Sequence, residues 1–171
     1  TAGDLGSADL SMNSCGRLDV GDIAGEARMA INGSGDITTG AIGAAAHISI
    51  NGSGDIETGT IGREVSVSIN GSGDVLTDDV NGDANVSING SGDVEFGQVA
   101  ASMNGAFSAR INGSGDIAVR DGRAQPFEAY IGGSGDISFG GTAVDLVVRE
   151  NGGGDVSISE IEGSVNWTRN G

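Results

Sequence analysis

The stretch Ile31-Asn32-Gly33-Ser34-Gly35-Asp36-Ile37 decides the fold, because it recurs along almost the whole chain. Further copies run from Ile50 to Ile56, from Ile69 to Val75, from Ile88 to Val94 and from Ile111 to Ile117. A repeat of fixed length predicts that each copy is one unit of a stacked structure. The motif aspartates are spaced by 19, 19, 19, 23, 20 and 19 residues, at Asp36, Asp55, Asp74, Asp93, Asp116, Asp136 and Asp155.

The residues before each motif alternate between apolar and polar side chains. Apolar residues occupy every second position, at Val65, Val67 and Ile69, and serines occupy the positions between them, at Ser66 and Ser68. This period of two is typical of a half-buried strand. The glycine density and the β-branched residues oppose helix formation. A second apolar column also steps by nineteen residues, through Ile23, Ile42, Ile61, Val80 and, with the same step, Val99. We therefore predict an all-β fold, a single-stranded parallel β-helix (solenoid) of about nine coils with roughly 19 residues each.

The copies decay toward both ends of the chain. Gly132 replaces the asparagine of one copy, and the copy at 150–156 has lost both the leading isoleucine and the serine. Atypical terminal repeats are typical of the caps of repeat proteins. We expect a single β-solenoid domain over residues 1–171, with divergent, cap-like terminal coils at 1–18 and 156–171.

Composition and charge exclude several classes of function. The formal charge is −16, from 24 acidic residues against eight arginines, and such a field repels nucleic acid and anionic lipid. Divalent cations, cationic surfaces and neutral glycans remain open as partners. Cys15 is the only cysteine, so neither an intramolecular disulfide nor a zinc site of paired thiolates is expected. No apolar run is long enough for a membrane-spanning helix, and no recognisable signal peptide begins at Thr1, which is compatible with earlier cleavage.

The repeated Asn-Gly-Ser-Gly-Asp-Ile/Val, preceded by alternating Ser-Ile strands, resembles the head GIN domain family of auto-transporter adhesins. The likeness extends from about Asn13 to Ile161. This resemblance implies a bacterial, exported, β-helical protein with a role in adhesion, and it brings no catalytic residues with it. The Gly-Ser-Gly-Asp signature is intact at Gly33–Asp36, Gly52–Asp55, Gly71–Asp74, Gly90–Asp93, Gly113–Asp116 and Gly133–Asp136.

The aspartate column is a candidate metal site. Stacking in register places the carboxylates about 4.8 Å apart, and their repulsion costs on the order of 1 kcal/mol per pair in water. Calcium bound between carboxylates and glycine carbonyls would relieve this repulsion. Alternatively, each aspartate accepts backbone N–H groups at its own glycine corner, as in Asx turns, and this structural interpretation is favoured. The candidate calcium ligands are Asp36, Asp55, Asp74, Asp93, Asp116 and Asp136.

The motif asparagines form a second polar column. Stacked amides can hydrogen-bond along the axis of a parallel β-stack, which favours a structural role. The five members are Asn32, Asn51, Asn70, Asn89 and Asn112.

A candidate ligand-binding patch lies where the nineteen-residue rhythm breaks. Four residues are inserted between Gln98 and Gly105, and the segment 120–126 holds the lone proline, so we expect the wall of the solenoid to bulge there. Polar groups beside an exposed aromatic ring suit contacts with a glycan or a protein, although an ordinary solvated surface is the simpler alternative. The predicted patch consists of Arg110, Arg120, Arg123 and Tyr130.

The sequence does not predict an enzyme. His47 is the only histidine, and no motif of nucleophilic catalysis is present. A polysaccharide lyase built from Asp116 and Asp136 with Arg110 or Arg120 is a minor alternative that rests on fold analogy.

The leading hypothesis is a noncatalytic domain, secreted, periplasmic or on the cell surface, that binds a cell-surface protein or a glycan. Calcium-dependent carbohydrate binding is the main alternative. A third is a self-assembling, homo-oligomeric solenoid, because the ends of a solenoid expose unpaired strand edges.

Overall fold

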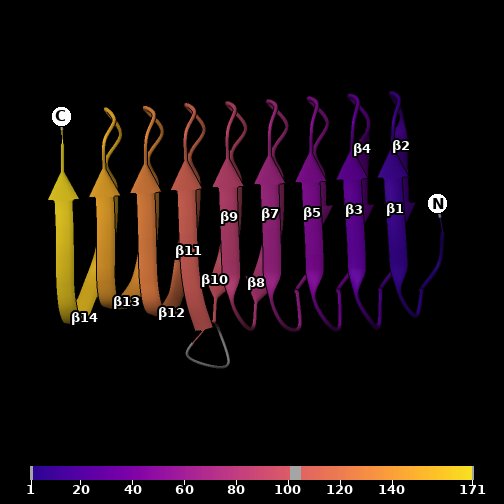
Figure 1. Ribbon diagram of the computed structural model, residues 1–171. Coiled ribbons are helices and arrows are strands. Elements are labelled where there is room, and N and C mark those ends of the chain that lie inside the picture. The colour runs from indigo at the N-terminus through magenta and orange to yellow at the C-terminus, as the bar shows by residue number, and fades with distance from the viewer. Residues whose placement is uncertain (1, 101–104, 171) are drawn as a thin grey trace.

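The computed structural model describes residues 2–100 and 105–170, and its only regular elements there are β-strands. Successive coils lie side by side along one axis, with the two termini at opposite ends (Figure 1). All strand pairings are parallel, in a single sheet that winds around the core. The predicted all-β parallel solenoid is confirmed, with about eight turns of about 19 residues, close to the predicted nine.

The strands form two ladders, one on each broad side of the solenoid. The first ladder contains β1 (Ala8–Met12), β3 (Ala27–Ile31), β5 (Ala46–Ile50), β7 (Val65–Ile69), β9 (Ala84–Ile88) and β11 (Gly105–Ile111). The second ladder contains β2 (Arg17–Val20), β4 (Asp36–Thr39), β6 (Ile56–Thr58), β8 (Val75–Val80) and β10 (Val94–Val99). Three long strands contribute to both ladders: β12 (Ile117–Ile131), β13 (Ile137–Glu150) and β14 (Val156–Arg169).

The second apolar column predicted from the sequence forms the narrow third side. In the N-terminal half it consists of isolated bridges that join Leu5 to Ile23, then Ile42, Ile61 and Val80. In β12, β13 and β14 the strand continues through this side without interruption. The segment 120–126, where a bulge was expected, lies within β12, and the register of β12 against β13 shifts between Val119 and Arg123. The inserted residues 101–104 lie outside the described part of the chain.

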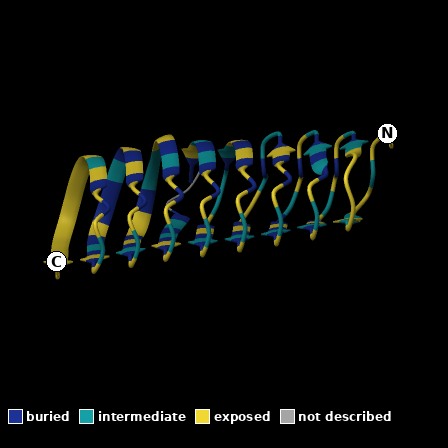
Figure 2. Cartoon of the chain, turned by 90° about the horizontal axis from the view of Figure 1, so that it is seen from above, coloured by how far each residue is buried: buried dark blue, intermediate teal, exposed yellow. Residues whose placement is uncertain are grey.

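Side chains of alternating strand residues fill a thin apolar core. The leading isoleucine of each motif is fully buried, and the alternation of buried and exposed residues repeats from coil to coil (Figure 2). In the C-terminal half the core holds Phe107, Phe127 and Phe139, whose ring centroids lie 5.0 to 5.5 Å apart. In the N-terminal half the core includes Thr58 and Thr77, and the Thr58 hydroxyl donates a hydrogen bond of 3.1 Å to that of Thr77.

The motif corner requires glycine because successive coils approach closely there. A Cβ atom on Gly52 would lie 1.8 Å from the carbonyl oxygen of Gly33, far inside van der Waals contact. The same carbonyl accepts a 2.9 Å hydrogen bond from the amide of Ser53, so the neighbouring coil cannot move away without losing it. The repeated motif is therefore primarily a folding signature.

Candidate binding faces

The two ladders give the molecule two different outward faces. We call the outward side chains of the first ladder, together with the motif asparagines, the amide–hydroxyl face, because serine and asparagine dominate it. We call the outward side chains of the second ladder, together with the motif aspartates, the acidic face. Their residues come from the same repeat, so each side-chain type recurs at the spacing of the coils.

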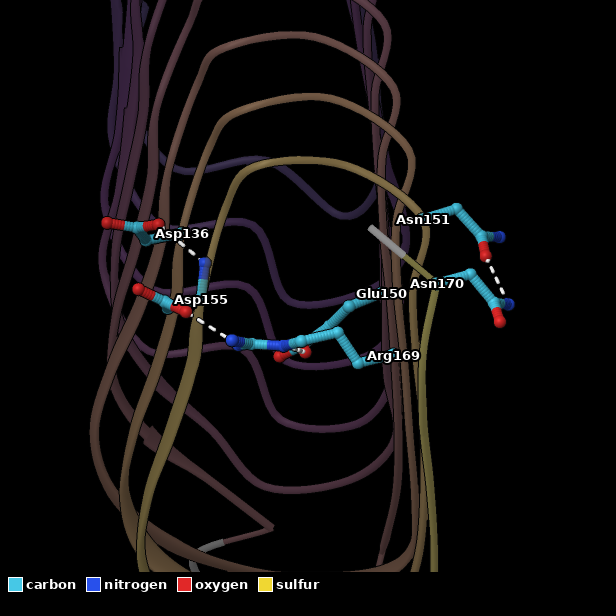
Figure 3. Close-up of polar contacts among 6 residues, drawn as sticks. All are labelled: Asp136, Glu150, Asn151, Asp155, Arg169 and Asn170. Atoms are coloured by element: carbon cyan, nitrogen blue, oxygen red, sulfur yellow. Dashed lines mark hydrogen bonds and ion pairs between the residues drawn. The ribbon is translucent and has the colours of Figure 1, made fainter.

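The asparagine column is an amide ladder, as predicted. Each side-chain Nδ2 donates to the Oδ1 of the preceding coil, over 3.0 Å from Asn32 to Asn13 and 3.1 Å from Asn70 to Asn51. The series extends through Asn112 and is interrupted at Gly132, before a last bond of 2.9 Å from Asn170 to Asn151 (Figure 3). The amide planes are thereby held at fixed positions along the face.

The aspartate column is also bonded between coils, which corrects one detail of the structural prediction. From Asp36 to Asp136, the Oδ1 atom of each motif aspartate accepts the backbone N–H of the aspartate in the next coil, and not an N–H at its own corner. The distances decrease from 3.2 Å at Asp36 to 2.7 Å at Asp93 and Asp116. Figure 3 shows the equivalent bond from the Asp155 amide to Asp136. Parallel winding makes this possible because it places each carboxylate beside the amide one coil further on.

The acidic face has a shallow open groove near its middle. Its polar lining comes from Asp55, Glu57, Asp74, Asp93 and Glu95 on three neighbouring coils. Within residues 2–100 and 105–170, however, no three or more His, Cys, Asp or Glu side chains are grouped to hold a metal ion. The predicted calcium ligands are thus aligned as a column on one face and stay a prediction.

The structure brings two residues of the predicted ligand patch together. Arg110 and Tyr130 are directly opposite in the pairing of β11 with β12, and the Arg110 Cζ atom lies 4.4 Å from the centre of the tyrosine ring. Arg149 follows in the same column on β13. These side chains border a small hollow of the amide–hydroxyl face together with Ser108 and Glu128. A cation over an aromatic face is attractive, so Arg110 restrains the orientation of the ring.

The other two predicted patch residues lie elsewhere. Arg120 points outward on the second ladder, where its Nε donates a 3.0 Å hydrogen bond to Glu95. Arg123 lies on the narrow side and bonds Glu162 over 2.7 Å. Each ion pair raises the pKa of its arginine, chiefly through the side-chain hydrogen bond, and the pKa of Glu162 falls for the same reason.

The structure separates Arg110 from the two aspartates of the lyase alternative. Arg110 lies on the first ladder, whereas Asp116 and Asp136 belong to the column of the second ladder. Arg120 is engaged with Glu95.

An ion pair between a buried carboxylate and an exposed guanidinium group near the C-terminal end was missed by the sequence interpretation. Glu150 occupies the position of the leading isoleucine and is fully buried, and Arg169, one coil later, pairs with it (Figure 3). Arg169 also lies 2.6 Å from Asp155. Hydrogen bonding to Arg169 lowers the pKa of Glu150 and raises that of Arg169. The signal was present, because two charged residues, nineteen residues apart, continue the column of the leading isoleucine, but the first of them was interpreted only as decay of the motif.

Comparison with known proteins supports one family. The model of a family described as "Putative auto-transporter adhesin, head GIN domain" matches residues 3–100, which is more than half of the chain. No curated protein and no solved structure matches the chain. The described part of the chain also contains no helix long and apolar enough to cross a membrane.

Proposed function

The chain belongs to the head GIN domain family of auto-transporter adhesins, and on this premise we propose that it is a noncatalytic, exported binding domain. In this proposal the domain acts outside the cytoplasm, in secreted or surface-attached form. Its partner is a protein or glycan of a cell surface.

The observation that carries the proposal is the fixed array of polar side chains on the amide–hydroxyl face. Its amides are tied to one another from Asn13 to Asn112, and its strands are paired in register on both sides. A surface that is already ordered loses little conformational entropy when a ligand binds. Serine hydroxyls beside the amides can both donate and accept hydrogen bonds. Such an array suits an extended partner with regularly spaced polar groups.

A pair of matched variants tests which face binds. Replacing Ser68→Glu and Ser87→Glu adds two charges to neighbouring coils of the amide–hydroxyl face. Replacing Ala118→Glu and Ser138→Glu adds the same two charges to neighbouring coils of the acidic face. We expect the first pair to abolish binding of the labelled domain to bacterial or host cells, measured by flow cytometry, and the second pair to retain it. Equal loss in both variants, or no cell binding by the unaltered chain, would contradict the proposal.

Calcium-dependent carbohydrate binding on the acidic face is a second candidate, supported by the groove between Asp55 and Glu95. A metal bound only by the folded chain raises its melting temperature by mass action. An unchanged midpoint between millimolar calcium and excess chelator would remove this candidate, while an upward shift that disappears in Asp74→Asn would support it.

A further inference from the structure

The column formed by Arg110, Tyr130 and Arg149 is the part of the amide–hydroxyl face with the most specific chemistry. The three residues are consecutive partners in the parallel register of β11, β12 and β13. Adjacent strands are about 4.8 Å apart, so the backbones of the two arginines lie about 10 Å apart, with the tyrosine on the strand between them. We infer that this column, named here the Arg–Tyr–Arg column, binds the carboxylates of an acidic polysaccharide. The inference rests on the proposed binding role of the face and specifies its ligand class.

The ion pairing of the arginines supports this inference. Five of the eight arginines pair with carboxylates, namely Arg17, Arg28, Arg120, Arg123 and Arg169. No ion pair in residues 2–100 and 105–170 joins Arg110 or Arg149 to a carboxylate, although acidic residues outnumber arginines by 24 to eight. The guanidinium groups of Arg110 and Arg149 can therefore form charge-assisted hydrogen bonds, the strongest that arginine makes, with a carboxylate of a ligand.

The local charge of the face also permits an anionic ligand. Between β11 and β14, the outward columns that contain Ser108 and Arg110 hold two arginines and one carboxylate, Glu128. The aspartate column lies on the other ladder, and exposed charges further apart than about 8 Å are largely screened at physiological ionic strength. The formal charge of −16 therefore does not describe the field at this column.

Tyr130 and its neighbours favour a sugar over a small anion. The break in the amide ladder gives the ring its space, because a Cβ atom on Gly132 would lie 3.1 Å from Tyr130 Cε1 and 2.9 Å from Asn112 Oδ1. The half-buried ring thus takes the place of an amide in the face. An aromatic ring with flanking hydroxyl and amide groups matches the apolar face and hydroxyl edge of a pyranose. One disaccharide unit of an extended chain spans the distance between the two arginines.

The test uses the full chain and a hexamer of galacturonic acid, with the fully methyl-esterified hexamer as the uncharged control, in calorimetric titration. We expect the acid to bind and the ester to bind at least about tenfold more weakly, since the ester cannot form charge-assisted hydrogen bonds with the two guanidinium groups. Binding of the acid should weaken as sodium chloride is added. Equal affinity for acid and ester would overturn the inference.

Two double variants with the same change in net charge locate the site. Arg110→Gln with Arg149→Gln should reduce affinity for the acid at least about tenfold, whereas Arg120→Gln with Arg123→Gln should leave it within about twofold. Glu128→Gln should strengthen binding because it removes a like charge. Equal losses in both double variants would show general charge attraction and overturn the inference.

Two further measurements separate the alternatives. Circular dichroism and melting of each variant establish that the fold persists, which is expected because both arginines are exposed. A poly-glutamate peptide of equal charge that competes as well as the hexamer would show a general anion site and refute the assignment to a sugar. If the chain binds cells as proposed but binds no acidic hexamer, this inference alone is wrong; if it binds neither, the proposed function fails as well.

Discussion

The N-terminal coils, residues 2–100, and the C-terminal coils, residues 105–170, differ in how each turn is closed and in which side chains fill the core. In the N-terminal coils each turn is closed by glycine corners and single bridges, and the core contains threonine and aliphatic residues, with Phe96 in the last of these coils. In the C-terminal coils the strands run continuously around the narrow side, and three phenylalanines fill the core. The family model matches only the first of these regions.

The difference shows where contacts between unlike side chains arise in a repeat protein. Where the repeat is regular, each side chain contacts its own copy in the next coil, so amides pair with amides and aspartates with the amides of aspartates. Where successive copies differ in residue type, unlike residues become neighbours. Arg110 then meets Tyr130, and Glu150 meets Arg169. Both contacts therefore lie in the C-terminal coils.

The largest expected effect comes from adding one methyl group to a corner of the N-terminal coils. A Cβ atom on Gly71 would lie 1.9 Å from the carbonyl oxygen of Gly52, and the equivalent Gly152 of the C-terminal coils is equally crowded. Gly153, which replaces the motif serine, has no atom within 4 Å of such a position and serves as the control. We expect Gly71→Ala to destabilise the domain by more than about 5 kcal/mol, and Gly153→Ala to change stability by less than about 1 kcal/mol. Urea denaturation of both variants checks this; similar midpoints would show that the coils can separate locally.

The phenylalanine core should be the next most sensitive feature. Phe127 is fully buried between Phe107 and Phe139, and Val65 occupies the same inward column in the N-terminal coils. Phe127→Ala should cost about 3–5 kcal/mol and Val65→Ala about 2 kcal/mol, because the larger side chain leaves the larger cavity. Thermal and urea unfolding measure both values. A cost for Val65→Ala equal to that for Phe127→Ala would contradict the distinction between the two cores.

The ion pair of the buried Glu150 with the exposed Arg169 predicts an acid-sensitive C-terminal region. Because Arg169 lowers the pKa of Glu150 in the folded state, the stabilisation is complete above the ordinary value near 4.5 and is lost as the pH falls through the lower folded value. Glu150→Gln should cost about 1–3 kcal/mol at pH 7 and make the stability difference from the unaltered chain smaller at acidic pH.

Melting curves between pH 7 and pH 2 test this, with Glu162→Gln as the control, since Glu162 forms an exposed pair with Arg123. An exposed pair contributes little to stability, so its loss should have a smaller effect. A constant stability difference between Glu150→Gln and the unaltered chain across this range would refute the prediction.

The smallest expected effect concerns the amide ladder. Asn70 donates to Asn51 and accepts from Asn89, whereas Asn151 has a ladder bond only with Asn170. We expect Asn70→Ala to cost about 1 kcal/mol and Asn151→Ala about half as much, because these bonds are exposed to water. Differential scanning calorimetry resolves such changes, and a larger effect at Asn151 would show that the ladder does not act through its own bonds.

Much of the fold was predictable from single residues and their spacing. The alternation of Val65, Ser66 and Val67 indicated a strand, and the nineteen-residue spacing of the aspartates fixed which residues stack. In a parallel solenoid the spacing itself sets the register, so the asparagine ladder followed directly. The partner of each aspartate did not follow, because a carboxylate can reach an amide in its own corner or in the next coil, and only the path of the backbone selects one of them.

The sequence by itself determined the coil length, the inward and outward columns and the glycine corners, because all three depend on local alternation and on a period that repeats along the chain. Only the tertiary structure decided which arginines share a face. Arg110, Arg120 and Arg123 are near one another in sequence, yet the chain turns between them, and they project from different sides of the solenoid. It also decided that Glu150 is buried, because the burial of a charge depends on the cation that the next coil places beside it.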